Sequence, residues 1–151
     1  MTATHTDLLA RLRSIASEAG VFGDIVLEGH RLQCEAADAG APAFYRVDLE
    51  PDAVWVSLVT EDRWLSESIE SDLMHSGDKL EELIEEELVD QGEEPGPVSF
   101  EHFRSEDMLF TFRTRVPARS ASSAAGVGRY LLAYEACFRN LGDMSASGDD
   151  E

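Results

Sequence analysis

Apolar residues recur every three or four positions in the first part of the chain. Leu8, Leu12 and Ile15 share one side of a helical projection, and Gly20 follows as a residue suited to ending a helix. The pattern predicts an amphipathic helix over residues 6–19, whose apolar side must pack on other elements of the fold.

The apolar period then shortens to two, which is typical of strands with one buried face. The segments that show it are "DIVLEG", "HRLQCEA", "FYRVDLE" and "VWVSLVTED", the last being the richest in β-branched and aromatic residues. A hairpin turning at Glu28-Gly29-His30 would join the first two segments. Because only a few residues separate consecutive segments, we expect an antiparallel meander of three or four strands.

The helical period returns between residues 65 and 88, where leucine and isoleucine recur every three, four or seven positions. Ser76-Gly77 interrupts this pattern, so the segment forms either one helix or two. In the second case Asp78 would cap the later helix, with Glu81 at the capping-box position. Glycine inside a helix costs only about 1 kcal/mol, so both alternatives stay open.

"SFEHF" and "MLFTFRTRV" predict a second hairpin, whose last strand ends before Pro117. A further apolar stripe, formed by Val127, Leu131, Tyr134 and Phe138, predicts a final helix. Serine is a favourable residue at the start of a helix. Three serines are candidates for this cap: Ser120, Ser122 and Ser123.

We therefore expect an α+β fold, in which helices pack on one face of an antiparallel sheet of about five strands. The expected order of elements is α-β-β-β-α-β-β-α. Residues 1–142 are predicted to form a single domain, and residues 143–151 are predicted to form a disordered acidic tail.

The net charge of the chain limits the kinds of molecule that we expect it to bind. The 151-residue chain has a net charge of −19, and residues 64–97 hold 12 acidic residues against one basic residue. Nucleic acids and anionic membranes both bind cationic patches, so we expect neither as a partner. The sequence has no membrane-length apolar run, no visible secretory signal and only two cysteines, which together predict a cytoplasmic protein.

The glutamates of this acidic segment lie opposite its apolar stripe on a helical projection, which predicts a solvated surface. Negative charge near the C-terminal end of a helix costs about 0.3–1 kcal/mol per group at low salt. A basic strand of the same chain, or of a second copy, would relieve this cost. The candidates for the positive charge are Arg113, Arg115 and Arg119.

Motifs for catalysis, cofactor binding and metal binding are missing from the sequence. The cysteines, Cys34 and Cys137, have no CxxC spacing, and free cysteine usually behaves as a small buried apolar residue. "AAGVGRY" lacks the spacing of a phosphate-binding loop. We therefore expect no catalytic residue, no cofactor and no metal ion, and we predict that the protein is not an enzyme.

Aromatic residues near the predicted strands are more numerous than one face of a sheet obviously needs. Some of them are expected to form an exposed apolar patch of the kind that marks a protein interface. The alternative is that these aromatic side chains simply fill the core. The candidate partner-binding residues are Trp55, Trp64, Phe100, Phe103, Arg113 and Arg115.

The order of elements resembles that of the YbjN-like, type III secretion chaperone-like family over residues 6–141. The resemblance is one of layout, and it transfers no site residue. It implies a non-enzymatic, cytoplasmic, often dimeric protein that holds an extended segment of another protein. The parts that carry it are "DLLARLRSIASEAG", "FYRVDLE", "VWVSLVTED", the Leu80–Leu88 helix, "SFEHF…MLFTFRTRVP" and a last helix with Tyr130, Leu131 and Tyr134.

We accordingly expect a chaperone-like or regulatory protein-binding module, forming a homodimer, that holds a partner segment on apolar surface of its sheet and helices. Two other classes stay open. One is a small-molecule-binding domain or enzyme with a pocket between the helices and the sheet. The other is an acidic mimic of nucleic acid, whose carboxylates would occupy the cationic groove of a DNA-binding protein.

Overall fold

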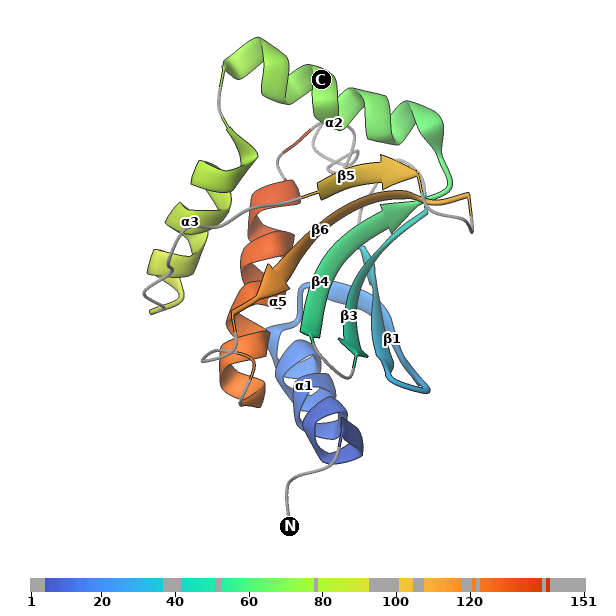
Figure 1. Cartoon of the computed structure of the whole chain (residues 1–151), viewed down its shortest axis with the longest axis vertical. Helices are drawn as coiled ribbons and strands as arrows, with labels where there is room; N and C mark the ends of the chain where they lie inside the picture. The colour runs from blue at the N-terminus through green and yellow to red at the C-terminus, as the bar shows by residue number, and fades with distance from the viewer. Residues whose placement is uncertain are drawn as a thin grey trace.

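In the part of the chain that the structure describes, six strands form an antiparallel sheet and the helices cover one of its faces (Figure 1). The computed structural model describes residues 5–36, 42–50, 53–77, 79–92, 101–104, 108–117, 121, 123–139 and 141. The helices in these ranges are α1 (His5–Ala19), α2 (Arg63–Ser76), α3 (Leu80–Asp90) and α5 (Ala124–Phe138). The strands are β1 (Phe22–Glu28), β2 (Arg31–Ala36), β3 (Ala43–Glu50), β4 (Ala53–Thr60), β5 (Glu101–Arg104) and β6 (Phe110–Val116).

The strands lie in the order β1-β2-β3-β4-β6-β5, and every neighbouring pair is antiparallel. The first four strands form the expected meander, with Gly29 in the left-handed region (φ 60°) at the turn between β1 and β2. The chain then passes through α2 and α3 before β6 returns beside β4. The predicted α+β class, with helices on one face of an antiparallel sheet, is confirmed.

The described sheet has one strand more than expected, because β1 forms at its edge. Most of β1 is exposed, and only Phe22 and Ile25 are half-buried. An edge strand that is exposed to solvent along most of its length has little alternation of apolar and polar residues. The hydrophobic pattern of β1 in the sequence is weak for this reason. The helical segment after β4 is also divided, so the observed order is α-β-β-β-β-α-α-β-β-α.

Because side chains alternate between the two faces of each strand, one set of them faces the helices. On β3, Tyr45 and Val47 are almost fully buried there, while the alternate residues Arg46 and Asp48 belong to the opposite face. The predicted apolar stripe of the last helix is confirmed, because each of its members is completely buried: Val127, Leu131, Tyr134 and Phe138. These residues share one hydrophobic core with the inward side chains of the sheet.

α1 and α5 lie close together under the sheet, and a glycine makes this approach possible. A Cβ added at Gly128 would lie 3.1 Å from the Cγ2 atom of Ile15, which is tighter than ordinary packing. α1 ends where expected, with Gly20 directly after it. α5 begins at the expected serine cap, since the Ser123 hydroxyl accepts a hydrogen bond from the Gly126 N–H at 3.0 Å.

The break between α2 and α3 occurs at the glycine that the sequence indicated. Gly77 adopts a left-handed conformation (φ 77°), and its N–H donates to the Leu73 carbonyl at 3.0 Å. The interrupted pattern therefore forms two helices and not one. Asp78, the expected cap, lies outside the described residues, and Lys79 occupies the N-cap position of α3 without a side-chain hydrogen bond.

α3 packs its apolar side against α5, whereas the sequence predicted only that this side is buried in a layer of helices over the sheet. Leu80, Ile84 and Leu88 are buried, whereas Glu82 and Glu86 are exposed. The acidic helix is thus an ordinary amphipathic surface helix with a wet carboxylate side. The predicted tail, residues 143–151, lies outside the described residues.

Candidate functional site

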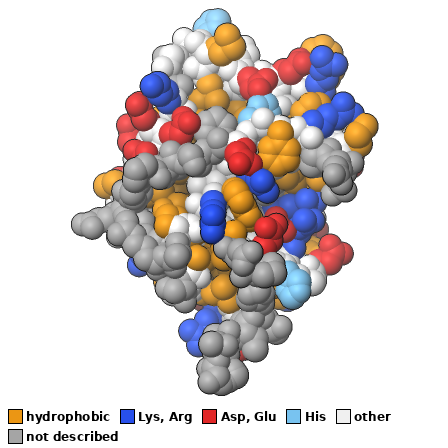
Figure 2. Space-filling model, in the orientation of Figure 1, with side chains coloured by type: hydrophobic (Ala, Val, Ile, Leu, Met, Phe, Trp, Pro, Cys, Tyr) orange, Lys and Arg blue, Asp and Glu red, His pale blue; other side chains and the backbone are white. Residues whose placement is uncertain are grey.

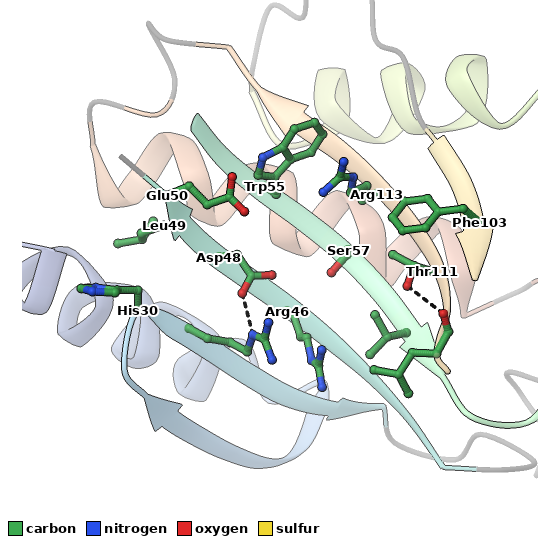
Figure 3. Close-up of a pocket in the computed structure, with 13 residues that line it drawn as sticks. His30, Arg46, Asp48, Leu49, Glu50, Trp55, Ser57, Phe103, Thr111 and Arg113 are labelled. Atoms are coloured by element: carbon green, nitrogen blue, oxygen red, sulfur yellow. Dashed lines mark hydrogen bonds and ion pairs between the residues drawn. The ribbon is translucent and has the colours of Figure 1, made fainter. Parts of the chain in front are cut away.

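The face of the sheet opposite the helices is not covered by any helix in the described ranges, and Figure 3 shows the helices lying behind the strands. We call this surface the open face. The cross-strand register places these side chains on it: Val26, Glu28, Arg31, Gln33, Glu35, Phe44, Arg46, Asp48, Glu50, Ala53, Trp55, Ser57, Val59, Glu101, Phe103, Thr111, Arg113 and Arg115.

Arg113 lies between two aromatic rings on the open face, close to the β5 edge of the sheet. Its guanidinium carbon is 3.9 Å from the ring centroid of Trp55 on β4 and 5.0 Å from that of Phe103 on β5. Its Nε also donates to a carboxylate oxygen of Glu101 at 2.9 Å. Stacking of this kind contributes about 0.5–1 kcal/mol at an exposed site, so the cluster holds its side chains in fixed positions before any partner arrives.

Two further arginines lie flat along β2 and β3, next to this cluster. Arg31 donates from Nε to the carboxylate of Asp48, directly across the strand pair. Arg46 donates from Nε to the side-chain carbonyl of Gln33 at 2.8 Å. A guanidinium has five N–H donors, so these contacts orient each arginine and leave it able to bind further acceptors.

The open face is hollowed in two places that join. One hollow of about 400 Å³ lies beside Trp55, Phe103 and Arg113. A second of about 680 Å³ lies towards Phe44 and Pro42, and the two share Arg46 and Leu109 as lining residues. We call the joined hollows the trough.

The trough is lined by charged side chains of both signs. Figure 2 shows basic side chains among hydrophobic and acidic ones on this side of the molecule, whereas the protein as a whole has a net charge of −19. The charged residues that line the first hollow are three arginines and two acids: Arg31, Arg46, Arg113, Asp48 and Glu50. The second hollow adds Glu61 and Asp62, so the trough as a whole is lined by three arginines and four acids.

The structure brings together three of the predicted partner-binding residues: Trp55, Phe103 and Arg113. Arg115 lies directly across from Trp55 in the register of β4 and β6. Trp64 is highly exposed on α2 and does not line the trough. Phe100 lies outside the described residues.

The expected relief of the acidic helix by arginines of the same chain is wrong for Arg113. This side chain is on the open face, where it pairs with Glu101, while α3 packs against α5 on the covered side of the sheet. Alternation along β6 explains the result, because Phe112 and Thr114 occupy the positions that face the helices. Arg119 lies outside the described residues.

A second polar cluster, which the sequence analysis missed, lies between α2 and β5. Nδ1 of His102 is 2.6 Å from a carboxylate oxygen of Glu70, and Nε2 is 3.3 Å from the hydroxyl of Ser66. The imidazole also stacks on Phe112, with ring centroids 3.9 Å apart. Ser66 and His102 are 36 positions apart, so no local spacing could have revealed the contact.

The pKa of His102 is lowered from its usual value of 6.5 by burial, although the charge and hydrogen bond of Glu70 act in the opposite direction. The cysteines are both buried, as predicted, and burial raises the pKa of Cys34 and of Cys137 to about 12. Neither thiol is ionised near neutral pH, so neither is a ready nucleophile.

The described residues lack two features, a cluster of metal ligands and a membrane-spanning helix. They contain no group of three or more His, Cys, Asp or Glu side chains placed to hold a metal ion. The helices in the described ranges also lack the length and apolar character needed to cross a membrane.

The fold and its surface define a class: an α+β protein whose antiparallel sheet has one helix-covered face and one open face with an arginine-aromatic trough. Comparison of the chain with known protein families, with curated proteins and with solved structures finds no match. The resemblance to YbjN-like and secretion chaperone-like proteins therefore stays a prediction based on layout.

Proposed function

We propose that this protein is a binding module that holds a segment of a partner protein in the trough of its open face. The observation that carries the proposal is the stack of Arg113 between Trp55 and Phe103 on a sheet face without helix cover. The similarity in layout to YbjN-like and secretion chaperone-like proteins supports the same function.

The composition of the trough suits protein binding. Tryptophan and arginine are the residues that most often dominate the energy of protein interfaces, especially where they are held in place before binding. Trp55 and Arg113 are both half-buried, so their contacts restrict them while part of each surface stays accessible. Binding would remove this remaining surface from water.

The chemistry of the trough favours a partner segment that combines apolar side chains with charged side chains of both signs. Phe44, Phe103 and Leu109 supply apolar contacts, while Arg46 and Arg113 supply charged donors. An extended segment fits a trough that crosses several strands, and β5 at the edge of the sheet offers backbone groups for strand addition.

A second copy of the chain is one such partner, as the expected homodimer requires. The exposed carboxylates of α3, including Glu82 and Glu86, are complementary in charge to the arginines of the open face. Light scattering at low and high salt measures this association. A strict monomer would exclude the homodimer and would leave the binding of other segments to the peptide experiment below. A cytoplasmic location likewise stays a prediction.

The proposal is tested by selecting peptides from a displayed random library on the wild-type protein and measuring their affinity by titration calorimetry. Trp55→Ala is expected to weaken binding at least ~10-fold, because it removes both an apolar contact and the platform of Arg113. Trp64→Ala is the matched control, since Trp64 does not line the trough. Failure to select any peptide, or equal losses in the two variants, would contradict the proposal.

A further inference from the structure

Ser66, His102 and Glu70 form a hydrogen-bonded chain at the wall of a separate pocket. The pocket has a volume of about 470 Å³ and lies between α2 and the β5–β6 edge of the sheet, which Figure 1 shows side by side. Its lining residues are Arg63, Ser66, Glu67, Glu70, His102, Phe103, Arg104 and Phe110. The three members of the chain thus come from two elements that meet only in the folded protein.

The two ring nitrogens of His102 contact different partners. Nδ1 faces the carboxylate of Glu70 at 2.6 Å, which fixes the proton of a neutral imidazole on that nitrogen. Nε2 is then an acceptor, and the hydroxyl of Ser66 lies 3.3 Å from it. This is the arrangement in which a histidine removes a proton from a serine hydroxyl while a carboxylate orients the ring.

The surroundings hold this geometry in place. Ser66 and Glu70 are four positions apart on α2 and therefore lie on the same side of the helix. The helix is fixed at its start by Asp62, whose side chain accepts from the Leu65 N–H at 2.9 Å. The flat stack of His102 on Phe112 restricts rotation of the imidazole.

Other residues of the pocket can make apolar and charged contacts with an acyl substrate. Phe103 and Phe110 provide apolar contacts, and the guanidinium groups of Arg63 and Arg104 line the same pocket. Donors of this kind stabilise the negative oxygen that develops when a carbonyl carbon is attacked. Ser66 is only 2% exposed, so neighbouring side chains of the pocket must move before an acyl group reaches the hydroxyl.

We propose that Ser66 is a nucleophile that accepts the acyl group of a small carboxylic ester, with His102 as general base and Glu70 as a positioning residue. This activity does not rest on the proposed function, although Phe103 lines both the trough and this pocket. It falls into the class of enzyme with a pocket between the helices and the sheet, which the sequence left open.

The chemical steps balance as follows for an ester. The Ser66 oxygen forms a bond to the carbonyl carbon while its proton passes to Nε2 of His102. The bond from carbon to the alcohol oxygen then breaks, and the leaving alcohol takes the proton from the imidazolium. A water molecule attacks the acyl-serine in the same manner, which releases the carboxylic acid and restores the serine hydroxyl.

Burial supports this role for the histidine, because it lowers the pKa of His102 below the usual 6.5 and so favours the neutral form that accepts a proton at pH 7. The imidazole contacts Ser66 and Glu70 on α2 and Phe112 on β6, and the other charged residues of the pocket are Arg63 and Glu67 on α2 and Arg104 on β5. The rate of serine acylation is therefore expected to rise with pH below 6.5 and to level off near neutral pH.

The experiment treats the full chain with an alkyl fluorophosphonate, which bonds to activated serines with loss of fluoride, and locates the adduct by peptide mass mapping. The proposal expects one adduct, on Ser66. No adduct, or an adduct on another residue, would overturn it, and this result needs no variant to fold.

Variants then test each role through the rate of adduct formation. His102→Phe keeps a ring for the stack on Phe112 and is expected to lower the rate about 100-fold or more. Glu70→Gln is expected to lower the rate and to move the midpoint of its pH profile to lower pH, since the carboxylate raises the pKa of His102. Ser68→Ala on the same helix is the control with an unchanged rate, and equal rates in all four proteins would reject the assignment.

Discussion

Tyr134 and Thr114 form the best-defined polar contact inside the core. Their hydroxyl oxygens are 2.6 Å apart, both residues are buried, and the contact joins α5 to β6. Burial raises the pKa of Tyr134 well above its usual value of 10.0, so the phenol stays neutral and able to donate. A buried hydroxyl needs such a partner, because leaving it without one costs more than the bond contributes.

Removing one of the two hydroxyls should therefore lower the free energy of unfolding more than removing both. Tyr134→Phe is expected to lower the free energy of unfolding by about 1–2 kcal/mol, because it leaves the hydroxyl of Thr114 buried without its partner. Adding Thr114→Val should recover part of this loss. Urea unfolding of the two single variants and the double variant gives the comparison, and strictly additive losses would contradict the expected coupling.

At the scale of elements, α3 shows how apolar and acidic positions divide on one helix. Ile84 is completely buried against α5, and Glu86, two positions later, is exposed. The stability of the helix in the fold thus depends on its apolar stripe, while its carboxylates remain in water.

Truncation of each side chain should separate these roles. Ile84→Ala is expected to lower the free energy of unfolding by about 2–4 kcal/mol, because it leaves a cavity between α3 and α5. Glu86→Ala should change it by less than about 0.5 kcal/mol, as is usual for an exposed site. Denaturant unfolding measures both values, and a large loss for Glu86→Ala would show that the carboxylates are not merely solvated.

The interface of α3 and α5 also contains a carboxylate that opposes folding at neutral pH. Burial raises the pKa of Glu135 on α5, and the charge of Glu87 on α3 adds to this effect, although Arg139 acts in the opposite direction. The folded protein therefore binds this proton more tightly than the unfolded chain. It follows that the group favours folding as the pH falls through its raised pKa, and opposes folding above it.

Glu135→Gln should remove this opposition while keeping an oxygen for Arg139. The variant is expected to be more stable than the wild type at pH 7, and its advantage should shrink as the pH is lowered towards 4. Thermal unfolding followed by circular dichroism across this pH range measures the difference. An advantage that grows at low pH would contradict the assigned direction of the pKa shift.

The elements with strong periodicity were predictable from the sequence. α1, β3, β4 and α5 each bury one clear stripe or face, so apolar spacing located them closely. The existence of β1 was uncertain because its side chains are mostly exposed, so apolar and polar residues do not alternate clearly along it. The break at Gly77 was open because glycine tolerates both a helix interior and a left-handed cap.

At the scale of the whole molecule, the sheet separates two surfaces of different chemistry. The helices and their carboxylates lie on one side, and the trough with its arginines lies on the other (Figure 1 and Figure 3). The candidate site could be predicted only as a set of residue types, because Trp55, Phe103 and Arg113 come together through the pairing of β4, β6 and β5. That pairing depends on contacts between distant segments, which periodicity does not determine.

The same reason explains why the cluster of Ser66, Glu70 and His102 escaped the sequence analysis. Each residue type alone is common. The three side chains come into contact only because β5 lies beside α2 in the folded protein. Motifs with fixed local spacing find sites that lie on one element, whereas this cluster spans two.

The central claim is that a partner segment binds in the trough, and the two tryptophans of the chain allow a direct test. Their indole N–H groups give two separate signals in a ¹⁵N–¹H spectrum, which Trp64→Phe assigns. On titration with a peptide selected on the wild-type protein, the signal of Trp55 should move and that of Trp64 should stay, because only Trp55 lines the trough. Movement of the Trp64 signal alone, or of neither signal, would contradict the account.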